Sequence, residues 1–166
     1  MKYPKNSKVI TKSGIEFKKT KIPKDFALIV DTREATPLFT RIPPGLTIIS
    51  RSLKHGDYSI LGFEDKVCIE RKQTSDFLSY IGSERQRTKK KLIAMDGMLW
   101  KSLVVETENP YDLPYYSKLT VEHVRAFLIS AKIRYGMHIY WSKSKEDIQR
   151  YVLDHLVKCY NILREV

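Results

Sequence analysis

Residues 56–76, GDYSILGFEDKVCIERKQTSD, decide the fold predicted for this chain. Two β-rich runs, at 58–61 and 66–71, flank the short turn at 62–65. Runs of this composition around a glycine-containing turn are typical of a β-hairpin. We therefore predict two antiparallel strands here, with a turn at His55-Gly56-Asp57 leading into the first of them.

Charged side chains cluster at one end of this hairpin. Because side chains alternate along a strand, Glu70 and Lys72 should share one face and Arg71 the other. Antiparallel pairing lets Asp57, just before the first strand, approach Glu70. Two carboxylates beside a lysine suit Mg²⁺, which takes oxygen ligands and retains several waters. A structural salt-bridge network at a sheet edge is the alternative interpretation.

The flanking sequence supplies further strands and helices around the hairpin. The continuous apolar run at 26–30 is typical of a buried strand and ends abruptly at Asp31. Other strands are predicted at 47–53, 102–106 and 137–141. Helices are expected to begin at Thr74 or Ser75, near Ser83, at Thr120 and at Ser144. Strands first, then helices alternating with strands, predict an α/β fold with a mixed sheet flanked by helices.

Charge points to a polyanionic partner. The chain has 166 residues with 30 Lys and Arg against 19 Asp and Glu, a formal net charge of +11. That surplus favours nucleic acid over an anionic membrane. The apolar runs are too short to cross a bilayer, and no secretory signal is visible, so we expect an intracellular protein without membrane contact. Cys68 and Cys159 lie in apolar segments and are expected to be reduced core residues.

The first 24 residues differ from the rest of the chain. They contain eight lysines and one acid, Glu16, with sparse apolar residues. We predict a basic, flexible or weakly structured arm, followed by one domain at 25–166. An extension that grips phosphates is one interpretation of this arm. The alternatives are a solvated terminus or a short hairpin of Val9–Thr11 with Glu16–Lys18.

The spacing of the charged motifs resembles a known family. Gly56-Asp57-Tyr58, an interval of eleven residues, then Glu70-Arg71-Lys72 and Asp76 are similar to the GDY…ERKxxxD pattern of XPF-type structure-specific nucleases. Residues 30–34, VDTRE, resemble that family's upstream segment. The resemblance covers about residues 26–106 and implies a restriction-endonuclease-like fold. Residues 25–166 would then be a nuclease domain.

The resemblance also implies roles for individual residues. Asp57 and Glu70 would bind Mg²⁺ or Mn²⁺, with Asp31 assisting, and Lys72 would be the catalytic lysine. Gly56 would permit a tight turn beside the metal. The supporting active-site residues would be Arg33, Glu34, Arg71 and Asp76.

A basic segment follows the motif closely, with five cations between Arg85 and Lys91. A solvated helix face is one interpretation, and contact with DNA phosphates is the one we favour. The candidate phosphate-binding residues are Arg85, Arg87, Lys89 and Lys90.

These features predict a metal-dependent DNA endonuclease acting on branched, flapped or junction DNA. One alternative is a catalytically silent nuclease fold that docks DNA or a partner, and another is an RNA-directed or RNA-guided processing factor. Many family members add a tandem helix-hairpin-helix module, which the last sixty residues do not resemble. We therefore expect a second copy, or a partner nuclease or helicase subunit, to help position the branched DNA. The compartment would be prokaryotic or virus-infected cytoplasm, or a nucleus.

Overall fold

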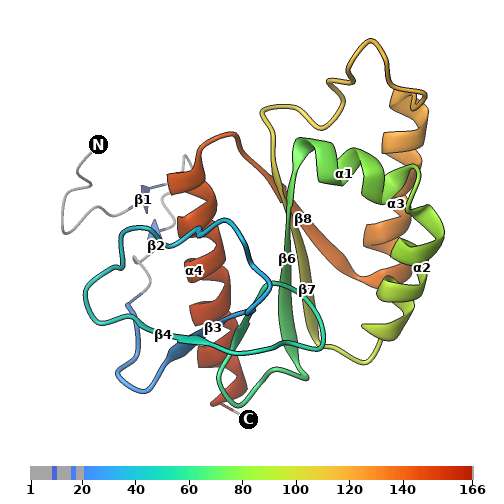
Figure 1. Cartoon of the computed structure of the whole chain (residues 1–166). Coiled ribbons are helices and arrows are strands. Elements are labelled where there is room, and N and C mark those ends of the chain that lie inside the picture. The colour runs from blue at the N-terminus through green and yellow to red at the C-terminus, as the bar shows by residue number, and fades with distance from the viewer. Residues whose placement is uncertain (1–8, 11–15, 18–20, 166) are drawn as a thin grey trace.

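The predicted hairpin forms and lies at the centre of a six-stranded mixed sheet (Figure 1). The computed structural model describes residues 9–10, 16–17 and 21–165. The strand order is β4-β3-β5-β6-β7-β8, in which β5 runs antiparallel to both of its neighbours and the other pairs are parallel. The strands span β3 (Ala27–Val30), β4 (Thr47–Ser50), β5 (Tyr58–Ile60), β6 (Val67–Gln73), β7 (Trp100–Glu106) and β8 (Met137–Trp141).

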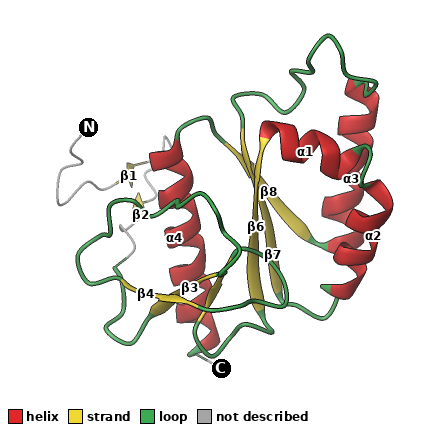
Figure 2. Cartoon of the chain, viewed as in Figure 1, coloured by secondary structure: helices red, strands yellow, loops and turns green. Residues whose placement is uncertain are grey.

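Helices cover both faces of the sheet, as the α/β prediction requires (Figure 2). One helix packs on one face and three pack on the other (Figure 1). The single helix is α4 (Lys145–Leu163), and the three are α1 (Thr74–Ile81), α2 (Arg85–Ala94) and α3 (Val121–Tyr135).

Alternation along β6 divides the interior into two cores. Val67 and Ile69 pack into the core beneath α4, whereas Cys68 packs into the core beneath α1, α2 and α3. The same alternation sends Glu70 and Lys72 toward α1, α2 and α3. This arrangement decides which helices can contribute to the site. Cys68 and Cys159 are buried free thiols, in agreement with the prediction.

Two of the predicted helix starts are confirmed and one is displaced. Thr120 is the N-cap of α3, and the Ser144 hydroxyl accepts a hydrogen bond from the Asp147 N–H at 3.2 Å at the start of α4. Thr74 does not cap α1, because Gln73 occupies the N-cap position. The Thr74 hydroxyl instead donates to the Glu106 carbonyl at 2.8 Å, which ties the start of α1 to the end of β7.

The predicted N-terminal arm falls mostly outside the described residues. Besides residues 21–24, its described part is the strand pair β1 (Val9–Ile10) and β2 (Glu16–Phe17), which pair antiparallel as the hairpin alternative predicts. Within the described chain, no helix has the length and apolar character that a membrane span requires.

Gly56 sets the close approach of the turn to β6. Its φ is +74°, and a Cβ there would lie 2.9 Å from the Ile69 carbonyl oxygen. The next residue, Asp57, donates its N–H to that same oxygen at 2.8 Å. Glycine at this position therefore lets the chain deliver Asp57 to the strand that carries Glu70.

We predict that Gly56→Ala lowers the free energy of unfolding by about 2–4 kcal/mol, because backbone strain adds to a steric clash. Gly62→Ala is the matched control, since Gly62 has a φ of +83° and open space around its Cβ position. The control should lose only about 1 kcal/mol. Urea unfolding measures both losses, and equal losses would contradict the proposed clash at Gly56.

Candidate active site

Glu70 is the centre of the site and is 1% exposed. The Lys72 ammonium lies 2.6 Å from Glu70 Oε1. The Lys91 ammonium, from α2, lies 2.6 Å from both Glu70 oxygens. Two cations thus hold one buried carboxylate, one from the same strand and one from the helix that faces it.

Asp57 is fixed beside Glu70 by the backbone of β6. Its carboxylate oxygen Oδ2 accepts from the Arg71 N–H at 2.7 Å. Burial, reinforced by the charge of Glu70, raises the pKa of Asp57 from 3.8 to about 6. The structure therefore brings Asp57, Glu70 and Lys72 together, as the strand alternation and turn predict.

The two lysines reverse the effect of burial on Glu70. Burial alone would raise the pKa of Glu70, yet Lys91 and Lys72 hold it below its usual value. Burial would likewise lower the pKa of Lys72, whereas the charge of Glu70 raises it. Lys72 also lies 5.5 Å from the centre of the Tyr80 ring, a cation–π distance. Both Glu70 and Lys72 are held as ions.

Arg71 points to the opposite face of β6 and forms a separate buried network. Its guanidinium pairs with Glu106 at the end of β7 and lies 3.4 Å from Glu34. It also donates to the Thr36 carbonyl oxygen, and Tyr58 donates its hydroxyl to Glu34 at 3.0 Å. These contacts hold the loop after β3 against the sheet. Arg71, Glu34 and Tyr58 are therefore parts of one buried network, and a supporting role of Arg71 and Glu34 in an active site stays a prediction.

Asp31 faces Arg33 and the loop after β4. Its Oδ1 accepts from the Arg33 backbone and Nε at 2.8 Å, and its Oδ2 accepts from the Leu53 N–H at 2.6 Å. The hydrogen bond from Arg33 lowers the pKa of Asp31 to about 2. No group of three or more His, Cys, Asp or Glu side chains suited to a metal occurs within the described residues. Asp31 as a third ligand to a metal held by Asp57 and Glu70 stays a prediction.

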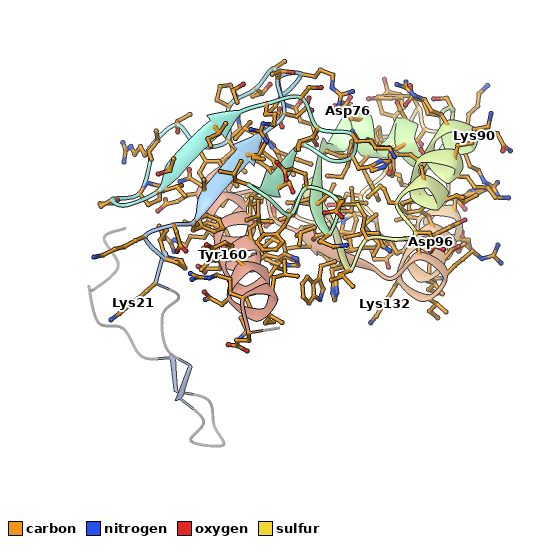
Figure 3. All side chains as sticks on the ribbon, turned by 90° about the horizontal axis from the view of Figure 1, so that it is seen from below. Lys21, Asp76, Lys90, Asp96, Lys132 and Tyr160 are labelled. Carbon is orange, nitrogen blue, oxygen red and sulfur yellow. The ribbon has the colours of Figure 1, made fainter. Side chains whose placement is uncertain are left out.

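The remaining predicted residues surround this centre at different distances. Asp76 is exposed in the first turn of α1, where its charge contributes to raising the pKa of Lys72. Arg87 lies 3.4 Å from Glu84 on the surface of α2. Lys90 points outward from the same helix (Figure 3). The helix therefore distributes its cations over several directions.

Arg85 and Lys89 line a pocket between α1, α2 and α3. Lys91, which follows the four candidate phosphate-binding residues, was not among the predicted site residues. The run of lysines does not indicate which of them faces Glu70, because the sequence does not specify how α2 is rotated against β6. The contact with Glu70 identifies it.

Most of the chain matches the model of a known protein family. Residues 30–154 match the ERCC4 domain. The chain belongs to the ERCC4 domain family. The match extends past the region 26–106 that carries the sequence motifs, through α3, β8 and part of α4. None of the curated protein sequences matches the chain.

The ERCC4 domain fold is also found in solved structures. The chain resembles XPF from Aeropyrum pernix in complex with DNA, with a TM-score of 0.60 and 20% identity over 81% of this chain. It resembles XPF from Aeropyrum pernix in a second structure, with a TM-score of 0.58 and 20% identity over 76% of this chain. This chain spans 64% and 59% of those two chains. The predicted family resemblance and the α/β fold with a mixed sheet are confirmed.

The opposite environments of Asp57 and Glu70 predict opposite effects of neutralising them. Because the pKa of Asp57 rises from 3.8 to about 6, folding retains a proton there that the unfolded chain releases. Stability from this group is therefore lost as pH rises from about 4 to 6. Asp57→Asn should be more stable than wild type at pH 7 by on the order of 1–3 kcal/mol, with the difference vanishing near pH 4.

Glu70→Gln should instead destabilise the protein at pH 7, because Lys72 and Lys91 lose their counter-charge. Urea unfolding in EDTA between pH 4 and pH 8 measures both variants against wild type. If Asp57→Asn is less stable than wild type at pH 7, burial and the charge of Glu70 do not make the ionised form of Asp57 unfavourable.

Proposed function

We propose that this ERCC4 domain is a metal-dependent DNA endonuclease that hydrolyses phosphodiester bonds, with branched, flapped or junction DNA as its substrate class. The observation that carries the proposal is the grouping of half-buried Asp57 and buried Glu70 with Lys72 at the end of β6. A purely structural ion pair between Glu70 and its lysines would not require a second carboxylate beside it. Burial and the charge of Glu70 raise the pKa of Asp57, so its negative charge is unfavourable at this position, and a bound cation would offset that cost.

Asp57 and Glu70 suit Mg²⁺ or Mn²⁺ as oxygen donors. Asp57 Oδ2 accepts from the Arg71 backbone, whereas Glu70 is held by the two lysines. Since the Lys91 side chain is 36% exposed, its ammonium has a path to solvent when a cation takes its place. Lys91 is therefore the flexible side chain that a cation at Glu70 would displace.

A divalent ion bound there would polarise a phosphoryl oxygen and lower the pKa of a bound water. Lys72 would stabilise the negative charge that develops on the phosphate, because Glu70 holds its ammonium at the same edge. Asp57 and Glu70 would hold the ion in place, and Arg71 would fix the strand that presents them. We infer products with 5′-phosphate and 3′-hydroxyl ends.

Charge and family membership support DNA as the partner. The net charge of +11 favours a polyanion, and α2 presents cations beside the site. The XPF of Aeropyrum pernix that shares this fold was solved in complex with DNA. A second copy or a partner subunit would help to position the arms of a branched substrate.

One contact favours a second candidate function. The ammonium of Lys91 takes both oxygens of Glu70, as it would in a binding module whose metal site is closed by its own lysine. In that case the chain would dock DNA or a partner without cutting it. Cleavage assays separate the two functions.

Purified protein with end-labelled single strand, duplex, 3′-flap, fork and four-way junction provides the first test. We expect cutting with Mg²⁺ or Mn²⁺ and none with EDTA. Asp57→Ala and Lys72→Ala should each lower the rate by about 10²-fold or more, because each removes a group that acts on the transition state.

Asp65→Ala is the matched control for these variants, since Asp65 is an exposed carboxylate in the turn of the same hairpin and pairs only with Lys66 among the described residues. Its rate should equal that of wild type. DNA binding without cutting of any substrate would overturn the endonuclease and support the binding module.

Lys91→Met tests the displacement directly, without measuring catalysis. Removing a cation from Glu70 should tighten Mn²⁺ binding roughly tenfold, because a like charge no longer competes for the carboxylate. Calorimetric titration with Mn²⁺ measures the change, and Lys90→Met controls for the loss of charge on α2. Weaker or unchanged Mn²⁺ binding by Lys91→Met would contradict the competition.

A further inference from the structure

A pocket of about 340 Å³ lies between α1, α2 and α3, separate from the carboxylates of the site. This volume is at the small end of the range for ligand pockets in proteins. Its apolar and aromatic lining includes Tyr80, Leu92, Phe127 and Tyr135. The sequence motifs do not account for this hollow.

Three cations surround the pocket and no acid lines it. Arg85 and Lys89 come from α2, one turn apart, and Arg134 comes from α3. All three side chains are exposed, and none has a hydrogen bond or an ion pair with another described residue. An aromatic hollow with three unneutralised cations suits a ligand that combines a flat ring with a phosphate.

Tyr80 connects this pocket to the candidate active site. It lines the pocket and is 4% exposed, and its hydroxyl has no hydrogen-bond partner among the described residues. Tyr80 also lies beside the candidate active site, because the Lys72 ammonium is 5.5 Å from the centre of its ring. A ligand in the pocket is therefore one aromatic ring away from the lysine that would contact the scissile phosphate.

We propose that this pocket holds one unpaired nucleotide of the DNA substrate. Phe127 and Tyr135 would pack against its base, and Arg85, Lys89 and Arg134 would bind its phosphates. Bases within a duplex are stacked and cannot enter, so the pocket selects strands that are unpaired next to the cut. This inference rests on the proposed function and assigns its preference for branched DNA to a specific place on the domain.

The test compares binding of two labelled DNAs by fluorescence anisotropy, in EDTA and at one fixed salt concentration. One is a fork with unpaired arms of ten nucleotides, and the other is a blunt duplex of the same stem. The double variant Lys89→Ala/Arg134→Ala should bind the fork at least tenfold more weakly than wild type, with no more than about a threefold loss for the duplex.

Two further variants separate the pocket from general charge. Arg125→Ala/Lys132→Ala removes two cations of α3 that do not line the pocket, and Figure 3 shows Lys132 at a different edge from Lys90. It should weaken fork and duplex binding equally. Ala126→Trp fills the mouth of the pocket without changing charge and should weaken fork binding alone. Circular dichroism checks that each variant folds.

Each outcome decides one proposal. Equal loss of fork and duplex affinity in the pocket double variant and in its charge-matched control would overturn the nucleotide pocket. Unchanged fork binding by Ala126→Trp would do the same, leaving the pocket for another ligand such as an acidic peptide. If wild type binds neither DNA, the proposed function itself fails. Cleavage of the fork by all the variants at the wild-type rate would retain the endonuclease and reject the pocket.

Discussion

The buried carboxylate of Glu70, held between two lysines, is the constraint on which the site depends. A carboxylate in the interior is costly unless it is paired, and here Lys72 and Lys91 meet it at 2.6 Å. One lysine is local to β6, and the other ties α2 to the sheet. The packing of α2 over this face is thus linked to the charge balance of the site. If a metal ion replaced Lys91 at Glu70, α2 would lose its ion pair with the sheet.

The two faces of β6 carry different groups of paired charges, one in the candidate site and one in the network around Arg71. Glu70 and Lys72 face the three-helix side, whereas Arg71 on the other face pairs with Glu106 and Glu34. Arg71 also presents its backbone N–H to Asp57. One residue therefore braces the loop after β3 and fixes a candidate ligand. Three successive charged residues can occupy this interior strand because the charges on both of its faces are paired.

Local sequence rules predicted the parts of the site that lie within one hairpin. Strand alternation separates Glu70 and Lys72 from Arg71, and the glycine turn places Asp57 beside Glu70. Contacts between distant elements were not accessible in the same way. Lys91 reaches Glu70 only because of the rotation of α2, whose short segment has few apolar residues to reveal its buried face.

Asp31 and the three-helix pocket show the same limit. The pairing of Asp31 with Arg33 and the Leu53 N–H depends on a loop whose path has no periodic pattern. The pocket depends on the packing of three helices. Anomalous diffraction from crystals grown with Mn²⁺ would reveal directly whether Asp57 and Glu70 form a cation site. We predict a manganese peak between these two carboxylates, with Lys91 withdrawn from Glu70. An intact contact between Lys91 and Glu70 without a manganese peak there would contradict it.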